Sequence, residues 1–454
     1  MNLHALLRAR AAAGRPVRVA LIGAGKFGAM FLAQARRTPG LHVLGIADLD
    51  PQRTRDTLTR VGWPVEAFAA RDAAGARAHG TTWVGDDAAA LIAADGVDVV
   101  VEATGNPAAG SRHALTAFAH GRHVVMVNVE ADALVGPLLA HRARAAGLVY
   151  SLAWGDQPAL ICEMVDWARA AGFEVIAAGK GTKYLPAYHA STPDTVWGHY
   201  GLSAADAAAG GMNAQMFNSF LDGTKSAIEM CAVANATGLA PPDDGLGFPP
   251  CDVDELAERL KPRAAGGVLA APGMVEVVSS LARDGAAVAR DLRWGVYCVF
   301  KAGDAYVRRC FAEYGLKTDA SGWYGAMYKP YHLIGLELGI SVASVALRGE
   351  PTGQPQAWHG DVVATAKRAL AAGELLDGEG GHTVWGKLVP AARSLAADAL
   401  PLGLAHGCRV RRDLASGEIV RWTDVELDAN DATARLRREL EREFSNASDA
   451  VAPA

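Results

Sequence analysis

Three closely spaced glycines follow the first apolar run of this chain. Residues 17–22 read Val-Arg-Val-Ala-Leu-Ile, and Gly23, Gly25 and Gly28 come next in the pattern GxGxxG. Gly23 suits a tight turn, Gly25 leaves room for a pyrophosphate at a helix N-terminus, and Gly28 lets the helix pack closely on the strand. Asp48 ends the next apolar run, where a carboxylate can accept hydrogen bonds from ribose hydroxyls. The pattern predicts a dinucleotide-binding turn; a glycine-rich turn without a nucleotide is the alternative.

Several further residues are expected to contact the same cofactor. Lys26 and Phe27 lie inside the glycine pattern. The charge of Asp48 repels a 2′-phosphate and favours NAD, whereas Arg53 could turn toward that phosphate and favour NADP. The other predicted contacts follow later apolar runs, near the nicotinamide half: Thr104, Gly105, Asn106, Asn128 and Glu130. Asn106 could equally serve only to shape a turn.

Charged residues later in the chain are candidates for catalysis. Lys183 ends the run Gly-Lys-Gly-Thr-Lys, whose flexible backbone could form a seat for a carboxylate or phosphate, although a solvated loop is the alternative. Lys329 suits an oxyanion and His332 suits proton transfer near neutral pH, while a buried structural histidine is the commoner case. Asp156 precedes a helical run and could either cap that helix or contact the substrate.

The composition limits the classes of partner. A chain of 454 residues is long for one core and predicts two or three domains. Its 44 basic and 49 acidic side chains give a net charge of −5 without a basic block, which argues against nucleic-acid or membrane partners and favours small polar ligands. The six cysteines form no CxxC pair, so no zinc site or disulfide framework is predicted. Residues 1–10 fit a short amphipathic helix better than a transit sequence, and we expect a cytoplasmic protein.

The elements that must position these residues alternate along the first third of the chain. Apolar runs at 17–22, 41–48, 97–104 and 123–128 are separated by helical segments with short glycine joints. This alternation predicts an α/β fold with an N-terminal Rossmann domain, a parallel doubly wound sheet. Ligands of such sheets lie beyond the carboxyl ends of the strands. The predicted contacts with the nicotinamide half, Thr104, Gly105, Asn106, Asn128 and Glu130, fall at or just after those ends.

The rest of the chain divides into two further segments. We assign residues 1–150 to the dinucleotide-binding domain, residues 151–350 to a central α+β catalytic and dimerisation domain, and residues 351–454 to a C-terminal segment and tail. Within the central domain, residues 213–239 predict one long helix. In the C-terminal segment, residues 370–376 and 414–420 share the pattern Leu-Ala, small residue, Gly-Glu, apolar pair, which predicts two similar turns.

Two of the runs resemble a known family. Residues 97–105, Val-Asp-Val-Val-Val-Glu-Ala-Thr-Gly, and residues 123–132, His-Val-Val-Met-Val-Asn-Val-Glu-Ala-Asp, are similar to homoserine dehydrogenase and its relatives. Val129 stands where those enzymes carry a lysine. With Gly-Asp-Gln-Pro at 155–158, Tyr-Lys-Pro-Tyr-His-Leu-Ile-Gly-Leu-Glu at 328–337 and the repeated turn pattern, the chain more closely resembles the homoserine-dehydrogenase-like proteins that carry a C-terminal SAF (β-clip) segment. That subgroup includes the deoxyxylulose-phosphate-reductoisomerase-like (DRL) enzymes.

The resemblance implies an NAD(P)-dependent oxidoreductase. The most specific activity that the resemblance implies is that of a reductoisomerase of isoprenoid biosynthesis, which acts on deoxyxylulose 5-phosphate or a similar small polyol or keto phosphate. A homoserine-type dehydrogenase of a small hydroxy or amino acid and a non-catalytic dinucleotide sensor are the alternatives. We also expect a homodimer.

The same resemblance implies roles for residues of the second domain. A helix of that domain would supply Lys225 as general acid or substrate clamp, with Glu229 on the same face; an exposed ion pair would give the same pattern. A reductoisomerase would use a divalent metal, for which Asp156, Glu130 and Glu229 are candidate ligands, although no spacing identifies a metal site.

Overall fold

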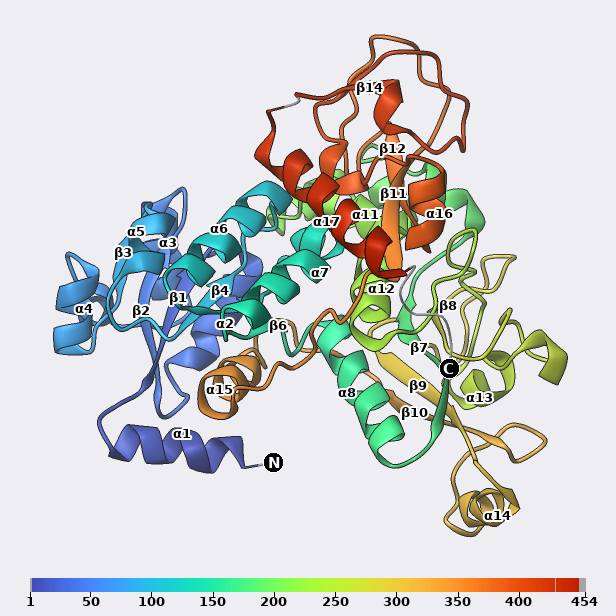
Figure 1. The fold of residues 1–454 in the computed structure, drawn as a ribbon, viewed down its shortest axis with the longest axis horizontal. Helices are drawn as coiled ribbons and strands as arrows, with labels where there is room; N and C mark the ends of the chain where they lie inside the picture. Colours follow the sequence, from blue (N-terminus) through green and yellow to red (C-terminus); the bar gives the residue numbers. More distant parts are fainter. Residues whose placement is uncertain (1, 429, 449–454) are drawn as a thin grey trace. The chain divides into compact units, whose positions relative to one another are not determined.

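The computed structural model describes residues 2–428 and 430–448, so residues 449–454 of the expected tail lie outside the described part. The chain forms two compact units (Figure 1). The first comprises Met1–Leu160 and His332–Gln356, and the second comprises Ile161–Tyr331 and Ala357–Ala454. None of the helices in residues 2–428 and 430–448 combines the length and apolar character that crossing a bilayer requires.

A six-stranded parallel sheet organises the first unit, in the order β3-β2-β1-β4-β5-β6. Its strands are β1 (Val17–Ile22), β2 (Leu41–Ala47), β3 (Trp83–Gly85), β4 (Val99–Glu102), β5 (His123–Met126) and β6 (Tyr150–Leu152). Most of their side chains are buried, as expected for strands covered by helices on both faces. The strand order reverses between β1 and β4, which confirms the predicted Rossmann sheet and marks the edge where its ligands bind.

Among the described residues, eight α-helices lie wholly in this unit, and α8 crosses its boundary. The eight are α1 (Leu3–Ala12), α2 (Lys26–Ala35), α3 (Pro51–Arg60), α4 (Ala73–His79), α5 (Ala88–Ala93), α6 (Pro107–Ala119), α7 (Val129–Ala145) and α15 (Gly339–Arg348). The helix expected in residues 1–10 is therefore present. The last helix lies outside the expected boundary of 150, because Leu338, Val342 and Val345 are buried in the same core as Val19 and Leu21 of β1.

A four-stranded sheet in the order β10-β9-β7-β8 forms the centre of the second unit. Its strands are β7 (Glu174–Thr182), β8 (Met274–Ser279), β9 (Val296–Lys301) and β10 (Tyr324–Lys329), with β7 parallel to β8 and antiparallel to β9. The helices before the C-terminal segment are α8 (Gln157–Ala170), α9 (Val196–Tyr200), α10 (Ala204–Ala209), α11 (Ala214–Leu221), α12 (Thr224–Thr237), α13 (Leu256–Arg259) and α14 (Ala305–Glu313). The buried helix α12 packs against β7 and β8.

The single long helix predicted for residues 213–239 is wrong. The segment forms α11 and α12, separated at Asp222 and Gly223. Gly223 has φ of +89°, a left-handed conformation that ends a helix and that glycine adopts without strain. The Oδ1 of Asp222 accepts the N–H of Thr224 at 2.8 Å, at the start of the second helix. Lys225 therefore lies in the first turn of α12 rather than in a helix interior.

The C-terminal segment contains the antiparallel pairs β11 (Gly360–Ala366) with β12 (Val384–Pro390), and β13 (Arg409–Val410) with β14 (Val425–Glu426), together with α16 (Ala391–Ala396) and α17 (Ala432–Ser448). The two predicted turns are present, and both Gly373 and Gly417 have positive φ. In each turn the glutamate that follows the glycine forms an ion pair with an arginine. Glu374 pairs with Arg368, and Glu418 pairs with Arg412. The repeated sequence pattern thus forms two turns with the same ion pair.

Candidate functional site

The three glycines of the first turn have different surroundings. A Cβ on Gly23, which has φ of +93°, would lie 2.7 Å from the carbonyl oxygen of Ala103, and a Cβ on Gly28 would lie 2.7 Å from the carbonyl oxygen of Gly23. A Cβ on Gly25 would meet nothing within 4 Å. Two of the glycines are therefore required by the fold, whereas Gly25 borders open space where a ligand can approach the backbone.

The start of α2 differs from the starts of its neighbours. Each of α3, α4, α5, α6 and α7 has an Asp or Asn at its N-cap whose side chain accepts a backbone N–H. Helix α2 has Gly25 at that position and no side-chain cap. Its first N–H groups and the positive end of its dipole are thus available to an anion. Lys26 is exposed beside this end and Phe27 is half-buried against the sheet core.

Asp48 connects the glycine turn to the end of β2. Its Oδ2 accepts the N–H of Ala24 at 2.7 Å, and its Oδ1 lies 3.1 Å from the guanidinium of Arg53. The Asp48 side chain is 8% exposed and that of Arg53 is 65% exposed. Asp48 is therefore held against the glycine turn, and its charge is paired with an exposed cation.

The ends of β4 and β5 meet in a hydrogen-bond network around Glu102, which is fully buried. One carboxylate oxygen accepts the hydroxyl of Thr104 at 2.7 Å and Nδ1–H of His113 at 3.1 Å. The other accepts Nδ2–H of Asn128 at 3.0 Å. Sequence reasoning missed Glu102, although an acid that ends a wholly apolar run was a usable signal. It joins two strand ends that border the expected nicotinamide site.

The predicted cofactor contacts at this edge have mixed surroundings. Asn106 and Asn128 cap α6 and α7 through the N–H groups of Ala109 and Ala131, so both side chains are held by the fold. Thr104, Gly105 and Asn106 are exposed, and Glu130 is half-buried in the first turn of α7. Val129, at the position of the family lysine, is 2% exposed in the core. A lysine could not replace it without burying a charge.

Asp156 and His332 also belong to the first unit. Asp156 is 5% exposed, and its Oδ1 accepts the N–H of Gln157, the first residue of α8. His332 is half-buried at the start of the segment that leads into α15. In that segment a Cβ on Gly335 would lie 2.7 Å from the carbonyl oxygen of Phe27. The segment after His332 thus lies against the start of α2, the helix with the glycine turn.

In the second unit, a buried ion pair joins β7 to α12. Nζ of Lys180 donates to Oε2 of Glu229, and their side chains are 8% and 5% exposed. Glu229 therefore has a partner on another element, which sequence spacing could not identify. Lys225 lies one turn earlier and is half-buried, in a helix whose other residues from Thr224 to Asn235 are buried. The sequence allows a surface ion pair between Lys225 and Glu229, whereas in the structure Glu229 forms a buried ion pair with Lys180.

The anion seat predicted around Lys183 does not form as expected. Gly179 and Gly181 lie inside β7, where a Cβ would come within 1.8 Å of the Glu276 carbonyl oxygen and 1.9 Å of the Leu292 carbonyl oxygen. Close strand packing, not a flexible loop, explains these glycines. Nζ of Lys183 donates to the carbonyl of His199, and burial lowers the pKa of Lys183.

Lys329 ends β10 and pairs in register with Val296 of β9. Its ammonium lies 5.4 Å from the ring centroid of Tyr331, a cation–π distance. Although the sequence places Lys329 and His332 close together, the chain passes from the second unit to the first between them. The structure therefore gives Lys329 a packing contact and leaves its proposed role with an oxyanion as a prediction.

The described residues do not fit a preassembled metal site. In residues 2–428 and 430–448 no group of three or more His, Cys, Asp or Glu side chains is arranged to hold a metal ion. Of the candidate ligands, Glu130 and Asp156 are in the first unit and Glu229 is paired with Lys180 in the second.

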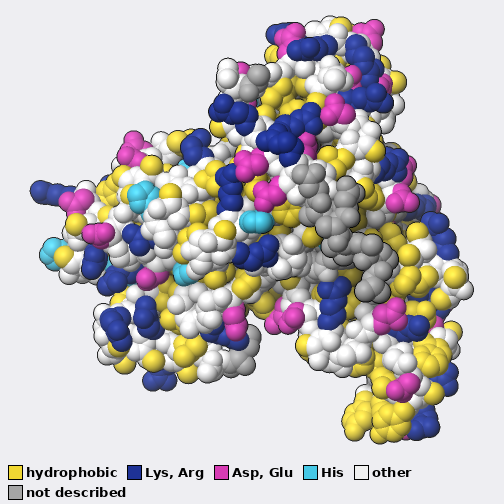
Figure 2. Space-filling view, viewed as in Figure 1, with side chains coloured by type: hydrophobic (Ala, Val, Ile, Leu, Met, Phe, Trp, Pro, Cys, Tyr) yellow, Lys and Arg dark blue, Asp and Glu magenta, His cyan; other side chains and the backbone are white. Residues whose placement is uncertain are grey.

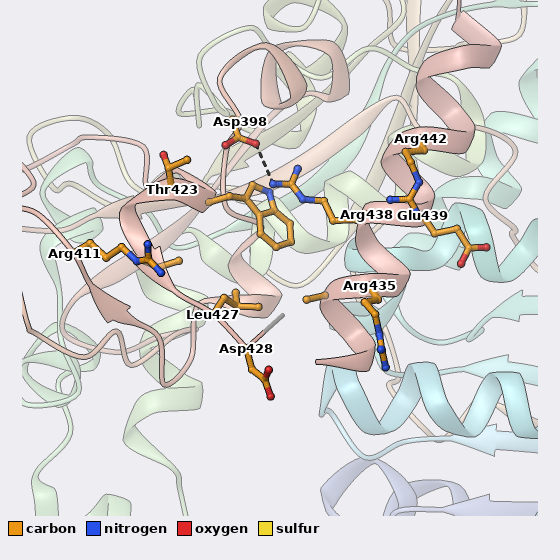
Figure 3. A pocket seen from close by; sticks show the side chains of 12 residues that line it. Asp398, Arg411, Thr423, Leu427, Asp428, Arg435, Arg438, Glu439 and Arg442 are labelled. Atoms are coloured by element: carbon orange, nitrogen blue, oxygen red, sulfur yellow. Dashed lines mark hydrogen bonds and ion pairs between the residues drawn. The ribbon is translucent and has the colours of Figure 1, made fainter. Parts of the chain in front are cut away.

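A cavity of about 830 Å³ lies in the second unit beside α17 (Figure 3). Arg438 extends from α17 to Asp398 at 3.1 Å, and its guanidinium lies 3.7 Å from the ring centroid of Trp422. Lys and Arg side chains are interspersed with Asp and Glu over this C-terminal part (Figure 2). None of the sequence-predicted site residues lines the cavity.

Three family models match the chain in succession. Residues 17–126 match the oxidoreductase family with an NAD-binding Rossmann fold, residues 155–338 match the catalytic domain of oxidoreductase DRL, and residues 361–426 match the SAF domain. Two of the three models describe domains of oxidoreductases. These matches confirm the resemblance to DRL-type oxidoreductases with an SAF segment, and with it the predicted fold class.

Solved structures of several oxidoreductases align with parts of this chain. An NAD-binding oxidoreductase from Klebsiella pneumoniae is 19% identical over 37% of this chain and 43% of its own, with a TM-score of 0.28. A second oxidoreductase from that organism is 15% identical over 75% and 87%, with a TM-score of 0.36. A homoserine dehydrogenase from Thiobacillus denitrificans is 20% identical over 42% and 44%, with a TM-score of 0.30. The aligned part of this chain thus spans less than half the length of the first and of the third of these proteins. None of the curated proteins matches it.

Proposed function

We propose that this protein is an NAD(P)-dependent oxidoreductase that moves a hydride between the nicotinamide and the carbonyl or carbinol carbon of a small hydroxylated substrate. The observation that carries the proposal is the start of α2, where Gly25 borders open space and no side chain caps the helix. A pyrophosphate bound there would accept the N–H groups that the fold leaves available. Asp48 and Arg53 would then contact the adenosine ribose, and the ends of β4 and β5 would border the nicotinamide.

The bound cofactor supplies or accepts the hydride, and the protein must stabilise the charge that develops on the substrate oxygen. We assign Lys225 this task, as the general acid that donates a proton to that oxygen during reduction and recovers it during oxidation. Its place in the first turn of α12 supports the assignment, because the positive end of a helix dipole also stabilises an oxyanion.

In its most specific version, the proposed activity is that of a reductoisomerase acting on deoxyxylulose 5-phosphate or a similar small keto or polyol phosphate. Its support is the match of residues 155–338 to the catalytic domain of oxidoreductase DRL. Homoserine-type oxidation is less favoured because Val129 is buried where the homoserine enzymes carry a lysine.

A cofactor-coupled assay tests the proposal. Purified protein is given NADPH with deoxyxylulose 5-phosphate, and in parallel NAD⁺ with homoserine and with other small hydroxy acids, while the nicotinamide absorbance is followed. Oxidation of NADPH in the first mixture supports the reductoisomerase, and reduction of NAD⁺ in the second supports the dehydrogenase. Cofactor binding by titration without turnover in any mixture would favour the dinucleotide sensor. The absence of cofactor binding would overturn the proposal altogether.

The proposal includes a homodimer in the cytoplasm. Sedimentation of the purified protein at several concentrations tests the first point, with a single species of one chain mass contradicting it. Fractionation of the native cells tests the second.

A further inference from the structure

The C-terminal segment has a lysine that lies deep inside the second unit. Lys367 follows β11, and its side chain is 2% exposed. Its ammonium lies 2.8 Å from Oδ2 of Asp222, and it donates to the carbonyl oxygens of Ser191 at 2.7 Å and Gly381 at 2.6 Å. Two hydrogen bonds to carbonyl oxygens and one ion pair to a carboxylate thus surround the ammonium group and hold it in one position.

Its charged partner, Asp222, lies at the end of α11, two residues before the first residue of α12. Asp222 is fully buried between α11 and α12, and its Oδ1 accepts the N–H of Thr224 at 2.8 Å. The backbone carbonyl of Asp222 accepts Nδ1–H of His189 at 2.7 Å. A carboxylate in this surrounding requires a cation, because an unpaired buried charge is strongly unfavourable. Burial raises the pKa of the Asp222 carboxyl, and the Lys367 ammonium opposes that shift, so Lys367 favours the charged carboxylate that accepts the N–H of Thr224.

Other residues of the same segment contact the start of α12 as well. The N–H of Gly386 in β12 donates to Oγ1 of Thr224 at 2.9 Å. The ring of Trp385 stacks on His189 with 3.8 Å between ring centroids, and His189 in turn donates to Asp222. Residues 361–426 are the part that matches the SAF domain. Figure 1 shows β11 and β12 beside α12, in agreement with their contacts.

We propose that Lys367 is a positioning residue for the reaction: through Asp222 it fixes the first turn of α12 and so places Lys225 at the substrate. This inference rests on the proposed role of Lys225. It gives the SAF segment a part in catalysis without contact to the substrate. A displacement of about 1 Å in a catalytic group can cost about a hundredfold in rate, so loss of this support should reduce turnover.

A matched pair of variants tests the structural half of the inference. Lys367→Met removes the cation from Asp222. Lys261→Met is the control, because Lys261 forms a similarly buried ion pair with Asp319 at 2.9 Å in the same unit, away from α12. Hydrogen exchange of the full chain should become at least about tenfold faster in the first turn of α12 in Lys367→Met and stay unchanged there in Lys261→Met. Unchanged exchange in Lys367→Met would overturn the inference.

If Lys367→Met does not fold, Asp222→Asn replaces it. The asparagine keeps an oxygen for the Thr224 N–H but removes the charge that faces Lys367, and the same acceleration of exchange is expected.

A double-mutant cycle with Lys225→Ala tests the catalytic half, with NADPH and deoxyxylulose 5-phosphate as the probe. Lys367→Met should lower kcat about tenfold to a hundredfold and leave the dissociation constant of NADPH unchanged. In the Lys225→Ala background it should cost almost nothing further, since it acts through that lysine. Equal fold losses in both backgrounds would show a general structural effect and overturn the positioning role. Full turnover by Lys225→Ala alone would instead overturn the proposed role of Lys225 and the catalytic half with it, while the exchange result would still decide the structural half.

Discussion

The guanidinium of Arg53 lies 3.1 Å from the carboxylate of Asp48, at the point where β2 leads into α3. The other carboxylate oxygen holds the N–H of Ala24 in the glycine turn. An acid at this position normally repels a 2′-phosphate, but here its charge is paired with an exposed arginine that can turn to meet that phosphate. The position is therefore compatible with both NAD and NADP.

We predict that Arg53→Ala weakens NADPH binding about tenfold and changes NADH binding by less than about threefold, since only the first has a phosphate for the guanidinium. Fluorescence titration with both cofactors measures the two dissociation constants. Arg60→Ala, on the same helix, is the control and should change neither. If Arg53→Ala weakened the binding of NADPH and NADH equally, Arg53 would support the glycine turn rather than bind the 2′-phosphate.

Gly25 and Gly28 should fail in different ways. A Cβ on Gly25 meets nothing, so Gly25→Val should keep the thermal stability of the wild type and abolish cofactor binding. A Cβ on Gly28 would lie 2.7 Å from a backbone oxygen, so Gly28→Ala should unfold at a lower temperature, with a loss of about 1 to 3 kcal/mol. Thermal melts and cofactor titrations separate the two effects. A Gly25→Val protein that still binds NADH or NADPH would contradict the dinucleotide site.

Lys225→Ala should lose about a hundredfold or more in turnover, because a donor aimed at the developing oxyanion commonly lowers the barrier by about 3 to 4 kcal/mol. The dissociation constant of the cofactor should hardly change, since the glycine turn lies in the other unit. Steady-state kinetics and titration on the same preparation provide both values. Near-wild-type turnover would direct the search for the donor to Lys183, Lys329 or His332.

The buried pair of Lys180 and Glu229 should contribute to stability. Glu229→Gln leaves the ammonium of Lys180 without a counter-charge in a buried place, which typically costs about 3 to 5 kcal/mol. Urea unfolding measures this loss. The double variant Lys180→Met with Glu229→Leu removes both charges and should recover most of it. A Glu229→Gln protein as stable as the wild type would show that water solvates the Lys180 ammonium or that another group compensates its charge.

His189 should make the fold sensitive to acid. Burial lowers its pKa to about 4, and the nearby cations Lys387 and Lys367 add to the effect, while the hydrogen bond to the Asp222 carbonyl opposes it. In the unfolded chain the pKa returns to its ordinary value of 6.5. The unfolded state therefore binds a proton between these values that the folded state does not.

The stability contribution of neutral His189 is thus fully present above pH 6.5 and falls by about 1.4 kcal/mol for each pH unit below it, until the pH reaches the folded pKa. Urea unfolding near pH 7 and near pH 5 should show a steeper loss for the wild type than for His189→Gln. Equal losses in the two proteins would contradict this assignment.

Local patterns predicted the first unit well. The spacing of Gly23, Gly25 and Gly28, after one apolar run and before another, is a local signal that was sufficient to predict the turn. The break at Asp222 was missed because the residues on both sides favour a helix; the dipeptide Asp-Gly was the available signal. The partners of Glu229 and Asp222 could not be predicted, since Lys180 and Lys367 reach them only once separate elements have packed together.

The return of residues 332–356 to the first unit has a consequence for synthesis on the ribosome. Helix α15 fills the core of the Rossmann sheet with Leu338, Val342 and Val345, but Ile161–Tyr331 must be made before it. At about 5 to 20 residues per second, that insertion delays the helix by about 10 to 30 s. During this interval the nascent sheet exposes an apolar face, and a chaperone that binds such faces would engage the chain there.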